Sequence, residues 1–150
     1  MFTLIIIVVV VWLIISALTP EKKEKGEIER AIKRTPSVSL NAMQKQPDNI
    51  DTFHYENGVV TIKMTNGGKY SGHLKNMVVN FTTEGGYRYN YNPVLKRTVP
   101  FYLGPIRKYV SITFNNNNSV RFLRDNAVFS DKDWDRIYNV LECAETIYRI

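Results

Sequence analysis

Hydrophobic and polar residues follow three different patterns along the chain. Residues 2–18 form an unbroken apolar block whose only polar side chains are Thr3 and Ser16. Residues 20–50 are mostly polar. From residue 51 onward, short runs that alternate hydrophobic and polar residues are separated by turns rich in Asn and Gly, which predicts antiparallel β-strands.

The apolar block predicts a transmembrane helix, with an anchor over residues 1–19. A helix rises about 1.5 Å per residue, so the block spans roughly 26 Å, near the short end for crossing a bilayer. A buried strand of this length would be unusual in a small domain, whereas a helix satisfies its own backbone groups in lipid. The candidate membrane-anchor residues are Leu4, Ile7, Val11, Trp12 and Ile15.

The charges that flank the block predict its orientation. Lys22, Lys23 and Lys25 follow the block and no Lys or Arg precedes it. The positive-inside rule therefore predicts that the helix is a single-pass signal-anchor in the cell (inner) membrane. The C-terminal domain that follows it is expected on the cytoplasmic side. A cleaved signal peptide is the alternative and would place the domain on the extracytoplasmic side, although the block has no positive N-terminal flank and no good cleavage site.

Two polar segments follow the block. Residues 20–34 predict a charged juxtamembrane helix in which acidic and basic residues recur at i,i+4 spacing. Its three lysines either contact anionic lipid or point into solvent on a stalk. Residues 35–50, with two prolines and scattered Ser, Asn and Gln, predict a linker.

The remaining segment, residues 51–150, predicts a β-rich domain built on a meander of about seven strands. Turn length sets strand register, so a two-residue turn at Asn57-Gly58 and a three-residue loop at Asn66-Gly67-Gly68 align the first strands and pair Met64 with Tyr70. Further turns are expected at Lys75-Asn76 and Glu84-Gly85-Gly86. Later strands are expected at 98–103, 109–114 and 120–122. The first five strands then share one apolar face, formed by Phe53, Tyr55, Val60, Ile62, Met64, Met77, Val79, Phe81, Tyr87, Tyr89 and Tyr91.

A C-terminal helix over residues 131–149 completes the predicted domain. Ser130 is its expected N-cap with Asp133 at N3, while Phe129 and Trp134 occupy the two positions of a hydrophobic staple. The predicted fold class is therefore α+β, an antiparallel barrel or sandwich capped by one helix. This order of elements over residues 50–150 resembles that of pleckstrin-homology-like barrels. The resemblance is one of topology and implies no site residues.

Composition narrows the class of protein. The chain has 150 residues, 44% of them hydrophobic, which excludes an intrinsically disordered chain. A single Cys excludes a disulfide framework and a zinc site built from cysteines. The formal net charge of +6 favours anionic partners or a lightly basic surface.

Candidate catalytic groups are few. The predicted register places His54 and His73 on the polar face of the sheet on either side of Thr61, roughly 9.6 Å apart at two strand spacings. A catalytic metal normally needs three protein ligands, and the chain has only two histidines. Two histidines that face solvent are the simpler interpretation. Ser71 has no recognisable nucleophile motif and Cys143 is expected to pack beside the helix, so the sequence predicts no catalytic residue, metal or cofactor.

Two basic pairs, Lys96-Arg97 and Arg107-Lys108, bracket one predicted hairpin and are the candidate contact residues for a protein partner or for anionic lipid headgroups. A domain tethered to a membrane makes lipid the nearer anion, so nucleic acid is disfavoured. Tyr87, Tyr89 and Tyr91 form a stripe that could stack on sugars or bases, but their register favours packing in the core.

The sequence thus predicts a single-pass, membrane-anchored, non-catalytic interaction domain that binds a protein partner or lipid headgroups at the membrane surface. One alternative is an extracytoplasmic domain that is part of an envelope structure or binds glycans. The other alternative is a metal-dependent or hydrolytic enzyme that uses the two histidines.

Overall fold

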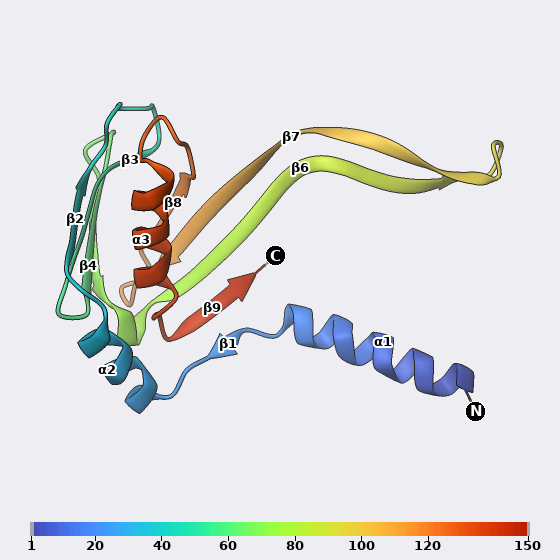
Figure 1. Ribbon diagram of the computed structural model, residues 1–150, viewed down its shortest axis with the longest axis horizontal. Coiled ribbons are helices and arrows are strands. Elements are labelled where there is room, and N and C mark those ends of the chain that lie inside the picture. The colour runs from blue at the N-terminus through green and yellow to red at the C-terminus, as the bar shows by residue number, and fades with distance from the viewer. Residues whose placement is uncertain (1, 150) are drawn as a thin grey trace.

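Two β-sheets and three α-helices make up residues 2–149 in the computed structural model, which describes that part of the chain (Figure 1). The mixed α+β character expected from the sequence is present, with strands predominating. In chain order the elements are α1 (Phe2–Leu18), β1 (Glu21–Lys22), α2 (Lys25–Arg34), β2 (Val38–Asn41), β3 (Ile50–Glu56), β4 (Val59–Met64), β5 (Lys69–His73), a 3-10 turn (Leu74–Asn76), β6 (Val78–Asn92), β7 (Arg97–Thr113), β8 (Ser119–Leu123), α3 (Asp131–Leu141) and β9 (Thr146–Arg149).

One sheet is antiparallel, in the order β2-β3-β4-β5. The two-residue turn between β3 and β4 is confirmed, because Tyr55 pairs with Val60 across it. The register predicted for β4 and β5 is wrong by two residues. Ile62 pairs with Tyr70, since the loop is closed earlier by the hydrogen bond from Met64 N to Gly68 O. A shift of two residues leaves every side chain on its predicted face.

The linker segment contributes a strand to this sheet. Residues 35–50 contain β2, which pairs with β3. Val38 and Leu40 are buried and alternate with exposed residues, the pattern of a strand with one face on the core.

The second sheet has the order β1-β9-β6-β7-β8 and contains a parallel pair. Helix α3 starts as predicted, with the Ser130 side chain accepting a hydrogen bond from Asp133 N. The predicted extension of this helix to residue 149 is wrong, because it ends at Leu141 and the chain returns as β9 beside β6. Ile147 is buried there opposite Val79.

The strands thus form two separate sheets, one of which contains a parallel pair. The predicted antiparallel meander of seven strands is therefore wrong, and so is the barrel of pleckstrin-homology type.

The largest departure from the prediction is the hairpin of β6 and β7. The predicted turn at Glu84-Gly85-Gly86 is wrong, since β6 continues through it to Asn92. Gly85 and Gly86 have φ of +87° and +82° and lie where the register shifts, so they form a bulge rather than a chain reversal. The two strands predicted at 98–103 and 109–114 are consequently one strand, β7.

The core lies between the two sheets and α3. Trp134 is fully buried at its centre and packs on Phe122, Phe129 and Tyr138. Among the described residues, Asn49 is the polar residue that is buried in the core. Its side-chain amide N–H donates a hydrogen bond to Leu123 O at 3.2 Å. This hydrogen bond links the start of β3 to the end of β8, which belong to different sheets.

Helix α2 packs against the folded core of the protein, which we call the body, and does not form a free stalk. Ile28 on its inner face is completely buried, and Glu29 forms an ion pair with Lys75 at 2.9 Å. The packing of this inner face against the core explains why such a short helix is stable within the protein.

Helix α1 corrects the prediction of a transmembrane anchor over residues 1–19. It has 17 residues, and no helix within residues 2–149 is both long and apolar enough to cross a membrane. Its length of about 26 Å falls short of a hydrocarbon core of about 30 Å. Ile7, Val11, Trp12 and Ile15 are between 47% and 65% exposed, whereas the side chain of Leu4 lies outside the described side chains. The single-pass and signal-anchor expectations are wrong for the same reason.

Candidate interaction surface

The β6–β7 hairpin extends far beyond the body of the protein (Figure 1). We call residues 84–107 of this hairpin the arm. Strand β9 pairs with β6 only as far as Phe81, and β8 pairs with β7 only from Tyr109. The outer edges of the arm are therefore unpaired within residues 2–149, and a two-stranded ribbon alone in water is only marginally stable.

One face of the arm is aromatic. Residues that pair directly across an antiparallel ladder share a face, and Tyr87 pairs with Tyr102, Tyr89 with Pro100 and Tyr91 with Thr98. We call these six residues the aromatic face. The rings of Tyr87 and Tyr102 lie 5.3 Å apart, and the four tyrosines are between 58% and 68% exposed. The prediction that Tyr87, Tyr89 and Tyr91 pack in the core is therefore wrong.

The opposite face of the arm is more polar. It is formed by three further ladder pairs, Arg88 with Phe101, Asn90 with Val99 and Asn92 with Arg97. The arm thus has one aromatic face and one face of mixed polar and apolar residues, and no second layer within residues 2–149 covers the aromatic side. A ribbon of this kind is typical of an element that is buried in a complex.

The tip of the arm is apolar but well structured. Val94 is 86% exposed and Leu95 is 53% exposed. The side chain of Asn92 accepts hydrogen bonds from the backbone N–H groups of both residues, each at 3.0 Å. These bonds brace the turn, on which both apolar side chains are exposed.

The four predicted contact cations do not form one site. Lys96 and Arg97 lie at the tip of the arm, whereas Arg107 and Lys108 lie at its base. Arg97 and Arg107 are ten positions apart along an extended strand, which corresponds to about 33 Å.

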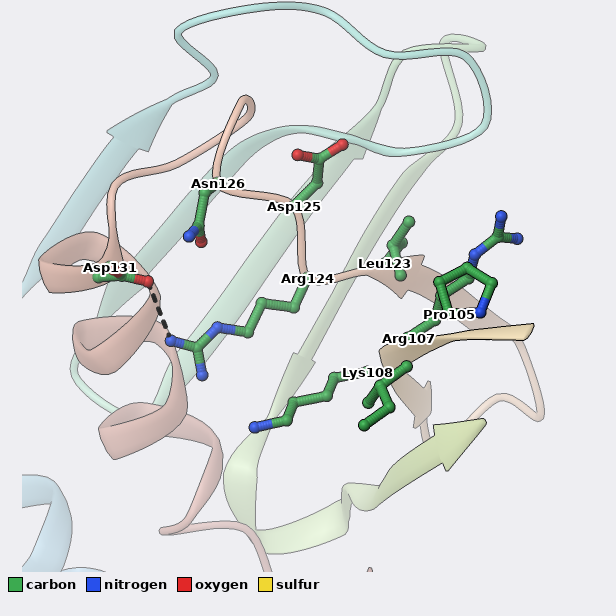
Figure 2. A pocket seen from close by; sticks show the side chains of 9 residues that line it. Pro105, Arg107, Lys108, Leu123, Arg124, Asp125, Asn126 and Asp131 are labelled. Carbon is green, nitrogen blue, oxygen red and sulfur yellow. Dashed lines mark hydrogen bonds and ion pairs between the residues drawn. The ribbon is translucent and has the colours of Figure 1, made fainter. Parts of the chain in front are cut away.

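Lys108 does line a pocket beside α3, together with Arg107 and Arg124 (Figure 2). The Arg124 side chain points toward α3 and forms ion pairs with Asp131 at 3.4 Å and Asp135 at 3.9 Å. Because these carboxylates already offset the positive charge, the pocket is not a concentrated anion site.

The other predicted basic cluster lies at the start of the body. Lys22 is in β1, the backbone of Lys23 donates to Glu145 O, and Lys25 begins α2. Glu24 and Glu145 line the same shallow surface, so acidic and basic groups alternate there as well.

The two histidines do not converge. His54 and Ser71 pair with Thr61 from either side, whereas His73 lies opposite Val59, two residues away from its predicted position. The Ser71 hydroxyl lies 3.1 Å from that of Thr61. No cluster of three residues that could hold a metal ion is found within the described part of the chain.

His73 has a structural contact that makes stability depend on pH. Its Nδ1 accepts a hydrogen bond from Lys75 N at 3.1 Å. Partial burial, and then the positive charge of Lys75, lower the pKa of His73 below its ordinary value of 6.5. The unfolded chain therefore binds a proton more readily than the folded chain in this range.

We expect the free energy of unfolding to decrease as the pH falls from 7.5 to 5.5, because protonation of His73 in the unfolded state favours unfolding. Urea unfolding at several pH values measures this slope. The variant His73→Asn should show a smaller slope, whereas His54→Asn serves as the matched control. An unchanged slope in His73→Asn would contradict the assignment.

The function of this chain has to be inferred from its own surface. No protein-family model, no curated protein and no solved structure matches the chain.

Proposed function

We propose that the chain is a non-catalytic interaction module that holds a protein partner on the aromatic face of its arm. The observation that carries the proposal is a row of four tyrosines, each more than half exposed, on one side of an otherwise unsupported ribbon. Tyrosine is enriched at protein interfaces because it buries a large apolar ring and keeps a hydroxyl for hydrogen bonding.

Protein is a better fit to this surface than the other ligands considered. Lipid headgroups need clustered cations, and the basic pairs of the arm lie at its opposite ends. Glycan and other small-ligand sites are concave with a few convergent polar groups, whereas the aromatic face lies along an extended two-stranded ribbon. The tyrosines and Pro100 instead form a continuous apolar strip along both strands, which suits the apolar part of a protein surface.

A photo-crosslinking amino acid at position 89 tests the proposal in cells that express the full chain. We expect irradiation to give a protein adduct of discrete mass, because Tyr89 lies in the middle of the aromatic face. The matched control carries the same amino acid at position 90, on the opposite face. Equal adducts from both positions, or no protein adduct from position 89, would contradict the proposal.

A further inference from the structure

We infer that the protein partner on the aromatic face is a second copy of this chain, with two arms packed face to face about a two-fold axis. This inference rests on the proposed function and names its partner. It follows from the charge, the chemistry and the area of the face.

The aromatic face carries no charge although the chain has a formal net charge of +6. Arg88 and Arg97 both belong to the opposite face of the ribbon. Two copies can therefore bring their aromatic faces together without placing like charges in contact, whereas packing the two opposite faces together would bring the arginines of both copies close and cost free energy.

The face is also chemically complementary to itself. Tyr87, Tyr89, Tyr91, Tyr102 and Thr98 each carry a hydroxyl, which both donates and accepts a hydrogen bond. A second copy supplies partners for these groups and apolar rings for the rings between them. A two-fold dimer requires such self-complementarity, because each copy contributes the same patch.

The exposed area matches that requirement. A tyrosine has roughly 200 Å² of surface, so four tyrosines at their observed exposure offer about 500 Å² per copy. Complete burial of these side chains in two copies would remove about 1,000 Å² from water, which is about the smallest total area of a specific interface, and Pro100 and Thr98 add to it. Burial of this area also supplies the second layer that a two-stranded ribbon lacks.

The molecular mass of the purified full chain in solution tests the inference. We expect a particle of twice 17.4 kDa by sedimentation equilibrium. Tyr89→Asp should weaken the dimer about 30-fold or more, because truncating a central interface tyrosine and adding a charge removes a hot spot. Asn90→Asp adds the same charge to the opposite face and should leave the dimer intact. Far-UV circular dichroism confirms that each variant is folded.

Crosslinking locates the interface. Packed sheets lie about 10 Å apart, which exceeds the reach of a disulfide, so a short bismaleimide is the suitable reagent. In a Cys143→Ser background, Tyr89→Cys should crosslink into a dimer and Asn90→Cys should not.

The outcomes separate this inference from the proposed function. A monomeric chain whose position 89 photo-crosslinks to a different protein overturns self-association but leaves the proposed function standing. A monomeric chain with no protein adduct overturns both. A dimer that Tyr89→Asp does not weaken is held by another surface and overturns the inference.

Discussion

Replacing Trp134 with alanine is expected to lower the free energy of unfolding by about 3–5 kcal/mol. The side chain is fully buried and lies against the rings of Phe122 and Phe129. Its indole N–H donates to Asp125 O at 2.9 Å, which fixes the loop before α3. Removal therefore leaves a cavity in the core and takes one of three donors from Asp125 O, which keeps the backbone hydrogen bonds from Val128 N and Phe129 N. Because small domains are stable by only about 5–15 kcal/mol, the loss should be visible in any unfolding curve.

Urea unfolding followed by circular dichroism measures this loss. The control is Tyr89→Ala, which removes an aromatic ring of comparable size from an exposed position and should change stability by less than about 0.5 kcal/mol in dilute, monomeric protein. A loss below about 1 kcal/mol in Trp134→Ala would show that α3 does not close the core as described.

Replacing Gly85 with alanine is expected to disrupt the arm while leaving the body folded. A Cβ at this position would lie 2.0 Å from the backbone oxygen of Pro105, and the φ of +87° is itself strained for alanine by about 1–3 kcal/mol. The bulge cannot keep its geometry, so the strands beyond it lose their register. Amide hydrogen exchange in residues 87–92 and 97–102 should accelerate by more than about tenfold, corresponding to more than 1.4 kcal/mol of local stability.

Gly67→Ala is the matched control for this variant. Gly67 also has a positive φ, +90°, but a Cβ there would meet no atom within 4 Å. Its replacement should strain the β4–β5 loop alone and leave exchange in the arm unchanged. Equal exchange in both variants would argue that the contact with Pro105 does not hold the bulge.

The features that the sequence predicted correctly are local ones. The Asn57-Gly58 turn determines its own register, because both residues adopt the positive φ that a two-residue hairpin needs. Ser130 caps a helix that begins at the next residue. In both cases the residues that decide the structure are neighbours in the chain.

The errors depend on residues far apart in sequence. Gly85-Gly86 bulges and does not reverse the chain because β6 pairs with β7 on both sides of it, and the backbone of Pro105 on that partner strand lies against Gly85. Residues 146–149 form a strand because β6 offers them an unpaired edge, although the preceding apolar spacing favours a longer helix. Neither partner is visible from the local pattern.

For the candidate site, the sequence predicted which residues share a face but not that this face is exposed. Alternation correctly places Tyr87, Tyr89 and Tyr91 on one face of a strand, but it reports only the side of the strand and not what lies over it. Exposure depends on whether a second layer exists at that position, and the body of the protein ends before the arm begins. The sequence predicted Arg107 and Lys108 between two strands, whereas both lie within the single strand β7.

The position of β9 has a consequence for the order of assembly during synthesis. This strand lies between β1 and β6, so residues 146–149 join a strand from the start of the body to one from its middle. Strand β1 pairs with β9 alone among the described strands. While residues 146–149 are still inside the ribosome, β1 has no strand to join and one edge of β6 stays open. The nascent chain therefore exposes an unpaired edge of β6 until residues 146–149 have left the ribosome, and such an edge can pair with another chain.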